Sequence, residues 1–217
     1  MQYRAIGLMS GSSLDGLDIV YAELDDSRGK WSYEIKAAAC IVYTSEWQTK
    51  LRHAVSLNAY EYLLLHTAYG RWIGDQVNEF IAANHLHHKV QLIASHGHTV
   101  FHAPHLRMTA QLGDGAVIAA VTGINTVSDL RSMDVALDGQ GAPIVPMGEK
   151  LLLKDYSYCL NIGGIANVTW IGTTEEELLA FDTGPGNGLL NDWCLRHVQQ
   201  PIDRDGLLAS YGSVSER

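Results

Sequence analysis

Small and hydroxyl-bearing residues gather near the start of the chain, where residues 9–18 contain two glycines and three serines. In a tight turn, the backbone N–H groups and hydroxyls of such residues can all point at one anion. The segment therefore predicts a phosphate cradle in which Asp15 binds Mg²⁺ directly or through water, because hard cations prefer carboxylate and phosphate oxygens. An ordinary turn, with Asp15 bonded to its own backbone, explains the same residues. The spacing matches neither a Walker loop nor a dinucleotide-binding fingerprint.

A second glycine-bearing bend occurs at Gly163 and Gly164, between two strand-like stretches. Glycine allows a backbone to turn sharply and to approach a ligand closely. The arrangement repeats that of residues 9–18, so the two hairpins could clamp a polyphosphate from opposite sides. Each hairpin is a weak signal alone, and each supports the other.

Asp182 follows an apolar stretch at residues 178–181 and precedes a glycine-rich turn and a predicted helix. Ligands meet α/β sheets at such strand ends, and a helix N-terminus adds N–H donors for an anion. Asp182 is therefore our candidate general base, which removes a proton from the attacking oxygen. A helix N-cap or a turn aspartate is the structural alternative.

Histidines cluster at His96, His98 and His102, with His105 close by. Alternation along a strand would put His96 and His98 on one face, which is a spacing that could suggest zinc. No nearby cysteine or paired carboxylate completes a convincing metal site, however. Hydrogen bonding of His98 to a substrate, or purely structural bonding, is the favoured interpretation.

Arg131 lies in a loop of mixed charge at residues 128–134. Its planar guanidinium suits a carboxylate or a phosphate, because two parallel N–H groups match two oxygens. A surface ion pair with Asp129 or Asp134 is the alternative interpretation.

The elements that must position these residues follow from hydrophobic periodicity. Period-two alternation predicts an antiparallel meander of three strands at residues 3–10, 18–24 and 31–42. Spacings of three and four then predict two amphipathic helices within residues 44–81. A short buried strand at 90–94 should end in a polar loop at 95–98, before a helix at 113–121 and a short strand at 125–127.

The second half of the chain is rich in glycine, since 13 of the 21 glycines lie between Gly97 and Gly188. That density is typical of loops that approach a ligand. The predicted elements there are a helix at 143–153, three strands at 156–161, 166–171 and 178–181, and a helix from about 186 to 197.

The composition limits the classes of protein to which the chain could belong. The chain has 217 residues, of which 47% are hydrophobic and 18% charged, so it can bury a core and is not disordered. The net charge is −9 without a basic run, which argues against nucleic acid and anionic membranes as partners. No apolar stretch approaches the roughly 20 residues of a membrane span, and no signal-peptide pattern is present. We therefore expect a cytoplasmic protein with reduced cysteines, at positions 40, 159 and 194, that serve in the core.

Taken together, five motifs resemble the anhydro-N-acetylmuramic acid kinase family in order and across essentially the whole chain. They are MSGSSLDGLD at residues 9–18, SHGHTVFH at 95–102, QGAP at 140–143, LNIGGIAN at 160–167 and FDTGPGN at 181–187. The resemblance implies an α/β, actin-like (ribonuclease H-like) two-domain kinase fold. Its first domain would span residues 1–125 and its second 126–217, the second being incomplete because the family pattern extends beyond residue 217.

The resemblance also implies an activity. Such kinases of bacterial peptidoglycan recycling use ATP and Mg²⁺ to hydrolyse the 1,6-anhydro ring and to phosphorylate O6, which gives N-acetylmuramic acid 6-phosphate. The expected partners are this amino sugar, ATP and a second copy of the chain. The alternative is a catalytically incompetent fragment that binds sugar or phosphate or dimerises, and a metal-dependent hydrolase using His96, His98 and Asp182 is a third interpretation.

Site residues follow from the same resemblance, position by position. Asp182 would activate the water that attacks the anomeric carbon, while the freed O6 takes the γ-phosphoryl group. Arg131 would meet the lactyl carboxylate of the sugar, and Asp15 would serve Mg²⁺. The family's ATP-binding positions fall on Gly11, Ser12, Ser13, Leu14, Asp15, Gly16, Leu17, Asp18, Gly163, Gly164 and Asn167, and its sugar-binding positions on His98, Ser128, Arg131 and Asn187.

Overall fold

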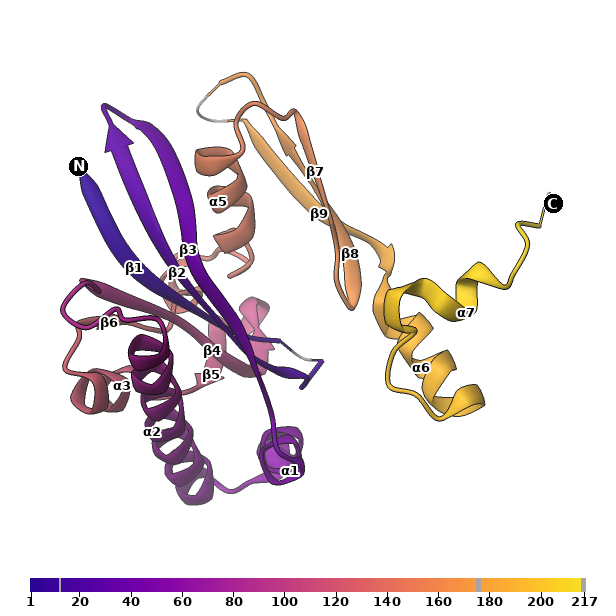
Figure 1. Cartoon of the computed structure of the whole chain (residues 1–217), viewed down its shortest axis with the longest axis horizontal. Helices are drawn as coiled ribbons and strands as arrows, with labels where there is room; N and C mark the ends of the chain where they lie inside the picture. The colour runs from indigo at the N-terminus through magenta and orange to yellow at the C-terminus, as the bar shows by residue number, and fades with distance from the viewer. Residues whose placement is uncertain (12, 175–176, 216–217) are drawn as a thin grey trace. The chain divides into compact units, whose positions relative to one another are not determined.

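The computed structural model describes residues 1–11, 13–174 and 177–215, and it has a mixed α/β architecture (Figure 1). The chain divides into two compact units, Met1–Leu152 and Leu153–Arg217. The elements of the first unit are β1 (Gln2–Ser10), β2 (Gly16–Ser27), β3 (Lys30–Val42), α1 (Ser45–His53), α2 (Ala59–Ala83), β4 (Leu92–Ala103), β5 (Met108–Leu112), α3 (Gly115–Thr122), β6 (Thr126–Val127), α4 (Ser132–Ala136) and α5 (Ile144–Leu152), with 3₁₀ turns at Ala54–Ser56 and Pro104–Leu106.

A mixed sheet with the strand order β3-β2-β1-β4-β5 forms the centre of the first unit. Strands β1, β2 and β3 are consecutive and antiparallel, which confirms the predicted meander. Strand β4 runs parallel to β1, whereas β5 is antiparallel to β4 and β6 pairs in parallel with the first part of β4. The end of β1 therefore meets the middle of β4, where Ser10 is the register partner of His98.

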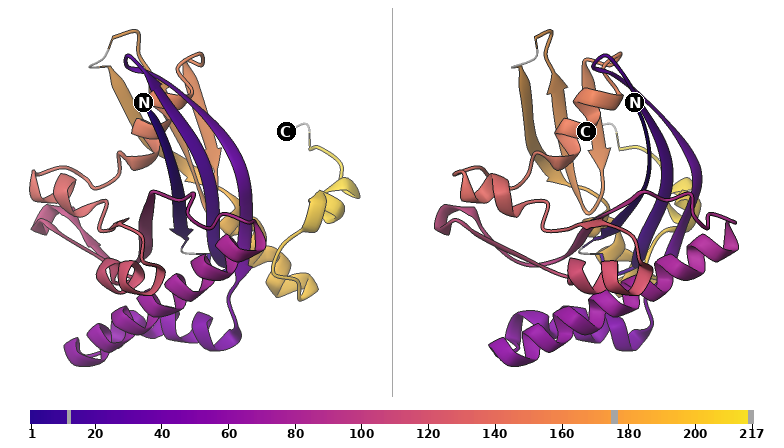
Figure 2. Two further views of the ribbon diagram at one scale, coloured as in Figure 1. Left: turned by 60° about the vertical axis from the view of Figure 1, so that its left-hand side comes forward. Right: turned by 90° about the vertical axis from the view of Figure 1, so that its left-hand side faces the viewer.

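The core lies between this sheet and the helices α1 and α2, which Figure 2 shows on the same side of the sheet. Ile6, Ile19 and Ile93 from the sheet and Tyr69 and Ile73 from α2 are all 0% exposed. The two helices predicted from spacing are confirmed as α1 and α2. Burial of this apolar stripe is what holds a long amphipathic helix on a sheet.

Two glycines allow α2 to pack closely against the segment that holds α3. A Cβ on Gly70 would lie 2.8 Å from the Asp114 carbonyl oxygen, and one on Gly74 would lie 2.7 Å from the Val121 side chain. Asp114 itself caps α3, because its Oδ1 accepts a hydrogen bond from the Ala116 N–H at 2.8 Å. Helix α3 is thus held against α2 near both of its ends.

Strand β4 differs from the prediction, because it continues to Ala103 and does not end in a loop after Ala94. The predicted loop at 95–98 is wrong because β5, which the sequence reading missed, pairs with the second half of β4. The strand accommodates Gly97 at a φ of 70°, and the register with β1 shifts between Leu8 and Ser10. This irregularity breaks the simple alternation expected for His96 and His98.

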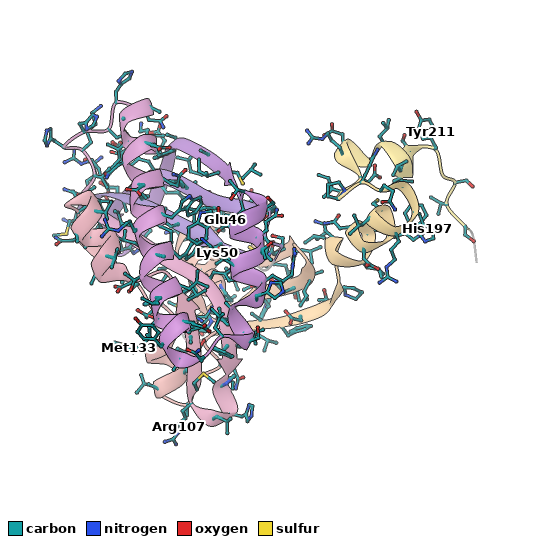
Figure 3. The ribbon with its side chains drawn as sticks, turned by 90° about the horizontal axis from the view of Figure 1, so that it is seen from below. Glu46, Lys50, Arg107, Met133, His197 and Tyr211 are labelled. Atoms are coloured by element: carbon teal, nitrogen blue, oxygen red, sulfur yellow. The ribbon has the colours of Figure 1, made fainter. Side chains whose placement is uncertain are left out.

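The second unit contains a three-stranded antiparallel sheet with the order β7-β8-β9. Its elements are β7 (Tyr158–Ile162), β8 (Ile165–Ile171), β9 (Leu178–Pro185), α6 (Asn187–Val198) and α7 (Leu207–Ser210), with a 3₁₀ turn at Arg204–Gly206. The three predicted strands and the following helix are confirmed. On α6 the rings of Trp193 and His197 lie 4.8 Å apart, and Figure 3 labels His197.

The division between the units falls after Leu152, whereas we expected the first actin-like domain to end at residue 125. Residues 126–127 form β6 and pair with β4, so they belong to the sheet of the first unit. How the units correspond to the domains of a complete protein stays a prediction. Within the described part of the chain, no helix combines the length and the apolarity that crossing a bilayer requires.

The cysteines occupy three different environments. Cys194 is buried, Cys159 is half-buried and Cys40 is exposed, so the expectation of a core role is wrong for Cys40. Partial desolvation and the neighbouring Asp18 carboxylate raise the pKa of the Cys40 thiol to about 11. This thiol therefore stays protonated at neutral pH, which makes it a poor nucleophile.

Candidate functional site

The turn between β1 and β2 is anchored to the core by Leu14. This residue has a φ of 56° and is 8% exposed, and its carbonyl accepts a hydrogen bond from Gln48 Nε2 of α1 at 3.1 Å. The Leu14 N–H donates a hydrogen bond to the Gly11 carbonyl at 3.4 Å, which joins the two ends of the turn. Ser12 lies outside the described residues. The turn is thus tied to α1 while its polar groups stay at the surface.

Asp15 is exposed, and its Oδ1 accepts hydrogen bonds from Ser13 Oγ at 2.7 Å and from the Gly16 N–H at 3.0 Å. This is the local bonding of the ordinary-turn alternative, and it also gathers hydroxyl and carboxylate oxygens at one exposed point. Among the described residues, no group of three or more His, Cys, Asp or Glu side chains could hold a metal. A single carboxylate nevertheless fits Mg²⁺, which is commonly bound by one or two carboxylates together with substrate phosphates and waters.

Gly16 and Leu17 belong to strand β2 and not to the turn. A Cβ on Gly16 would lie 2.7 Å from both Cys40 Sγ and the Ile41 carbonyl oxygen, so close packing against β3 requires glycine there. Leu17 is 1% exposed, whereas Asp18 is exposed on the same strand. Of these three residues, Asp18 alone presents its side chain to solvent, and Leu17 could contact a phosphate only through its backbone.

The second hairpin turns at Gly163 and Gly164, directly beside the N-terminus of α6. The Gly163 carbonyl accepts from the Asn187 N–H at 2.7 Å, and the Gly164 carbonyl accepts from the N–H groups of Gly186 and Gly188 at 3.1 and 3.2 Å. The first amides of α6, which have no partner inside the helix, are satisfied in this way. The bend and the helix N-terminus therefore form one rigid corner.

On the helix side of this corner there is no room for a Cβ atom, so glycine is required. On the hairpin side a Cβ atom would have room. A Cβ on Gly186 would collide with the Gly163 carbonyl oxygen, and one on Gly188 would lie 3.0 Å from the Gly164 carbonyl oxygen. On Gly163 a Cβ would meet only the Ile165 carbonyl oxygen, at 3.7 Å, among the residues that the structure describes. The outer side of the hairpin is thus open to a ligand.

Asp182 lies inside β9, which extends beyond the predicted end at residue 181. Its register partner on β8 is Asn167, so the structure brings these two candidate residues side by side. The side chain of Asp182 is exposed and that of Asn167 half-buried. The N-cap alternative for Asp182 is wrong, because the N-cap of α6 is Gly186. An exposed carboxylate beside an amide, on the strand that leads into the glycine corner, suits a general base.

Asn187 opens α6 and donates a hydrogen bond from Nδ2 to the Ile162 carbonyl at 3.2 Å. It therefore ties the end of β7 to the helix, in addition to its backbone bond to Gly163. To contact the sugar, Asn187 would have to use its Oδ1 atom or give up the bond from Nδ2 to the Ile162 carbonyl.

His98 is 6% exposed on β4, and its Nδ1 lies 3.1 Å from Ser10 Oγ. Ser10 Oγ in turn accepts a hydrogen bond from the Tyr43 hydroxyl at 2.8 Å. Burial lowers the pKa of His98, and the neighbouring His96 lowers it further. His98 is therefore neutral at pH 7 and can serve as a hydrogen-bond donor without carrying charge.

Arg131 is half-buried and contacts His96 rather than an aspartate. Its Nε donates to His96 Nε2 at 2.9 Å, and its Nη1 donates to the Gly141 carbonyl. His96 Nδ1 lies 2.8 Å from the Gly97 carbonyl, so His96 is the Nδ1–H tautomer. Burial lowers the pKa of His96 and the Arg131 charge adds to this effect, although the Gly97 bond opposes it.

The aspartates proposed as ion-pair partners of Arg131 bond elsewhere. Asp134 Oδ2 accepts from the Gly141 N–H at 2.6 Å, and Asp129 Oδ2 accepts from Ser128 Oγ at 2.8 Å. Both aspartates thus shape the loop around α4 and do not neutralise Arg131. The guanidinium keeps its charge and part of its donor set for a ligand.

The segment after α4 is joined to the residue that precedes β5. Arg107 forms an ion pair with Asp138 at 2.6 Å, and Figure 3 labels Arg107 and Met133 in this region. His102 Nδ1, on β4, lies 3.1 Å from Thr109 Oγ1 on β5. The Nδ1 atoms of His96, His98 and His102 therefore each have a different partner.

Sequence reading missed three residues that hold the site together. Ser10 and the tyrosines Tyr43 and Tyr69 form a buried hydroxyl cluster in which the two phenolic oxygens lie 2.5 Å apart. A buried polar cluster of this kind leaves no periodic signal, since Tyr43 and Tyr69 count as apolar residues in any helix or strand pattern. Of the three, only Ser10 belongs to a motif of the sequence analysis, residues 9–18, and it was not among the candidate site residues.

Each of the two units is an α/β unit with a glycine-bearing hairpin, which is the arrangement that the sequence predicted for a phosphate-binding class of protein. The sequence model of the anhydro-N-acetylmuramic acid kinase family matches residues 3–217. The chain belongs to this family.

Individual relatives agree with the family match. The chain is 42% identical over 220 residues to an anhydro-N-acetylmuramic acid kinase of Paramagnetospirillum magneticum, with 97% of the chain and 59% of that relative covered. It is 39% identical over 229 residues to the protein of that name from Rhizorhabdus wittichii, covering 97% and 60%. For Bacillus thuringiensis the identity is 35% over 223 residues, covering 96% and 58%. The chain thus spans about 60% of the length of the curated relatives it matches.

Proposed function

We propose that this protein is an ATP-dependent kinase that hydrolyses 1,6-anhydro-N-acetylmuramic acid and phosphorylates O6, giving N-acetylmuramic acid 6-phosphate in peptidoglycan recycling. Family membership over residues 3–217 supports the proposal. The observation that carries it is the pairing of Asp182 with Asn167 on strands that lead into the glycine corner at the N-terminus of α6. A base and a hairpin that can approach phosphate therefore occur in one small unit.

The proposed reaction needs one base. Asp182 accepts a proton from water, the water oxygen bonds to the anomeric carbon, and the bond from that carbon to O6 breaks. The released O6 attacks the γ-phosphorus of ATP, and ADP leaves. Phosphoryl transfer of this type depends mainly on positioning and on neutralisation of charge, so the protein has little covalent chemistry of its own to perform.

In this proposal each hairpin, considered within its own unit, offers groups that suit the phosphates of the nucleotide. The open outer side of Gly163 and the exposed hydroxyl of Ser13 suit phosphate oxygens, and Asp15 suits Mg²⁺ bound together with those oxygens. When bound, Mg²⁺ would neutralise charge that develops on the transferred phosphoryl group. Asp15 would hold it through its carboxylate, with the phosphates and water as the other ligands.

The sugar in this proposal is bound by His98, Ser128, Arg131 and Asn187. Arg131 is the residue suited to the lactyl carboxylate, because His96 and Gly141 hold its guanidinium and no acidic partner neutralises it among the described residues. We further propose the actin-like two-domain fold for the complete protein, a homodimeric state and a cytoplasmic location, where ATP is available.

The proposal is tested by product analysis with the full-length protein. Incubation with ATP, Mg²⁺ and 1,6-anhydro-N-acetylmuramic acid should yield ADP and N-acetylmuramic acid 6-phosphate in equal amounts, as measured by mass spectrometry. The matched control is the same reaction with N-acetylmuramic acid, in which the anhydro ring is already open. Binding of the anhydro sugar without any phosphorylated product would instead identify a sugar-binding module and would refute the kinase.

A further inference from the structure

A buried row of hydroxyl groups leads to the candidate sugar residue His98. Tyr69 on α2, Tyr43 after β3 and Ser10 at the end of β1 are 0%, 3% and 2% exposed. The Tyr69 and Tyr43 hydroxyls lie 2.5 Å apart, Tyr43 lies 2.8 Å from Ser10 Oγ, and Ser10 lies 3.1 Å from His98 Nδ1. A chain of hydrogen bonds from α2, through the residue after β3 and the end of β1, therefore reaches one ring nitrogen on β4.

The directions of these hydrogen bonds follow from counting hydrogens. The Tyr43 hydroxyl donates to Ser10 Oγ, so Tyr69 must be the donor in the bond between the two tyrosines. Ser10 Oγ accepts from Tyr43 and keeps its own hydrogen, for which His98 Nδ1 is the acceptor. The reverse direction, with Nδ1–H donating, would turn the Ser10 hydrogen towards the Tyr69 hydroxyl, so the two directions correspond to the two tautomers of His98.

We propose that Ser10, whose oxygen accepts from the Tyr43 hydroxyl, is the positioning residue that holds His98 as its neutral Nε2–H tautomer, so that His98 presents one fixed donor to an acceptor oxygen of the bound sugar. The contact with the sugar rests on the proposed function, whereas the tautomer does not. No hydrogen bond to Nε2 is found among the described residues, and the ring retains 6% exposure. The donor is therefore available to a ligand.

His96 provides an internal contrast two residues away. It is the opposite tautomer, because its Nδ1–H donates to the Gly97 carbonyl and its Nε2 accepts from Arg131. Gly97, at a φ of 70°, separates the two rings, so each meets its own partners. One histidine accepts at Nε2 to orient Arg131, and the other donates at Nε2.

The test is the ¹⁵N spectrum of the imidazole nitrogens, in which protonated and unprotonated nitrogens have well-separated shifts. Measured above the lowered pKa of His98, the wild-type protein should show a single His98 tautomer with the proton on Nε2. His98 with its proton on Nδ1, or as a mixture of the two tautomers, would overturn the proposal. This measurement needs no variant, so it stands even if a substitution prevents folding.

Two variants separate positioning from general packing. Ser10→Ala removes the donor to Nδ1 and should raise the fraction of the Nδ1–H tautomer by about tenfold. Tyr69→Phe is the matched control, because it removes a buried hydroxyl from the far end of the row while Tyr43 still donates to Ser10. It should leave the His98 tautomer unchanged. Equal tautomer populations in Ser10→Ala and wild type would refute the role of the row.

Ligand titrations of the full-length protein then test the contact. Addition of 1,6-anhydro-N-acetylmuramic acid should shift the His98 Nε2–H signal, whereas ADP with Mg²⁺ should not. A shift with ADP alone would assign the donor to a phosphate oxygen and overturn the sugar contact, as would sugar binding that leaves Nε2 unmoved. Absence of any sugar binding would contradict the proposed function itself, while the tautomer of wild type would still decide the hydroxyl row.

Discussion

Acidification should destabilise the first unit through His96 and His98. Both rings are buried, at 7% and 6% exposure, and burial lowers the pKa of each below its ordinary value near 6.5. Below that value the unfolded chain takes up protons that the folded protein excludes, so the free energy of unfolding decreases as the pH falls. The decrease starts near pH 6.5 and ends at the folded pKa, and stability is complete above this window.

The size of this effect follows from the number of groups. A lowering of the pH from 7.5 to 5.5 removes up to ~1.4 kcal/mol for each histidine whose folded pKa lies below that range, or ~2.7 kcal/mol for both. Carboxylates titrate mostly below this interval, so they contribute little. Against a typical domain stability of ~5–15 kcal/mol the loss is readily measured.

Urea unfolding at several pH values between 7.5 and 5.5 provides the assay. The double variant His96→Gln, His98→Gln should lose most of the pH dependence, whatever its absolute stability. His87→Gln, at an exposed position, is the matched control and should keep the wild-type slope. The reasoning fails if the double variant and wild type show the same slope, or if the protein becomes more stable as the pH falls.

Three further substitutions test other parts of the structure. Arg131→Ala should weaken binding of the anhydro sugar more than tenfold, equivalent to ~1.4 kcal/mol, with ADP affinity unchanged by calorimetry. The affinity for an analogue without the lactyl group should be the same in Arg131→Ala and in wild type. If the ratio of the affinities for the two sugars is equal in variant and wild type, a carboxylate contact of Arg131 is excluded. Gly163→Val should fold normally, since its Cβ has room, yet lose nucleotide affinity; unchanged ATP binding would reduce the second hairpin to a simple turn. Gly16→Ala should lower the free energy of unfolding by ~1–3 kcal/mol through overlap with the Ile41 carbonyl, and an unchanged urea midpoint would contradict the packing described for β2 and β3.

Most of the fold could be predicted from local patterns. The meander β1 to β3 and the helix α2 have clear periods of 2 and 3.6, and β1 and α2 bury the face that their period predicts. Strand β5 and the second half of β4 were missed because residues 95–112 include four histidines and carry no clear alternation. Strands β4 and β5 form a hairpin, whereas the pairing of β4 with β1 joins residues far apart in the sequence, which a local pattern cannot contain.

The candidate site was predictable in its residue types and less so in its contacts. Glycine and aspartate at bends indicated the two hairpins and Asp182, and β8 and β9 place Asp182 next to Asn167. The partner of Arg131 was not predictable, because His96 lies 35 positions away and meets it only through the pairing of β4 with its neighbours. The same holds for the hydroxyl row that joins Tyr69 to Ser10 across three elements.

The most direct test of the central claim is the turnover of Asp182→Asn in the full-length protein. Asparagine keeps the volume of the side chain and cannot accept the proton from water, so formation of N-acetylmuramic acid 6-phosphate in a single turnover should fall by ~10²–10⁴-fold. Binding of ADP and of the anhydro sugar should change little, and the unfolding midpoint should stay the same. A variant that forms product at a rate near that of wild type would contradict the account.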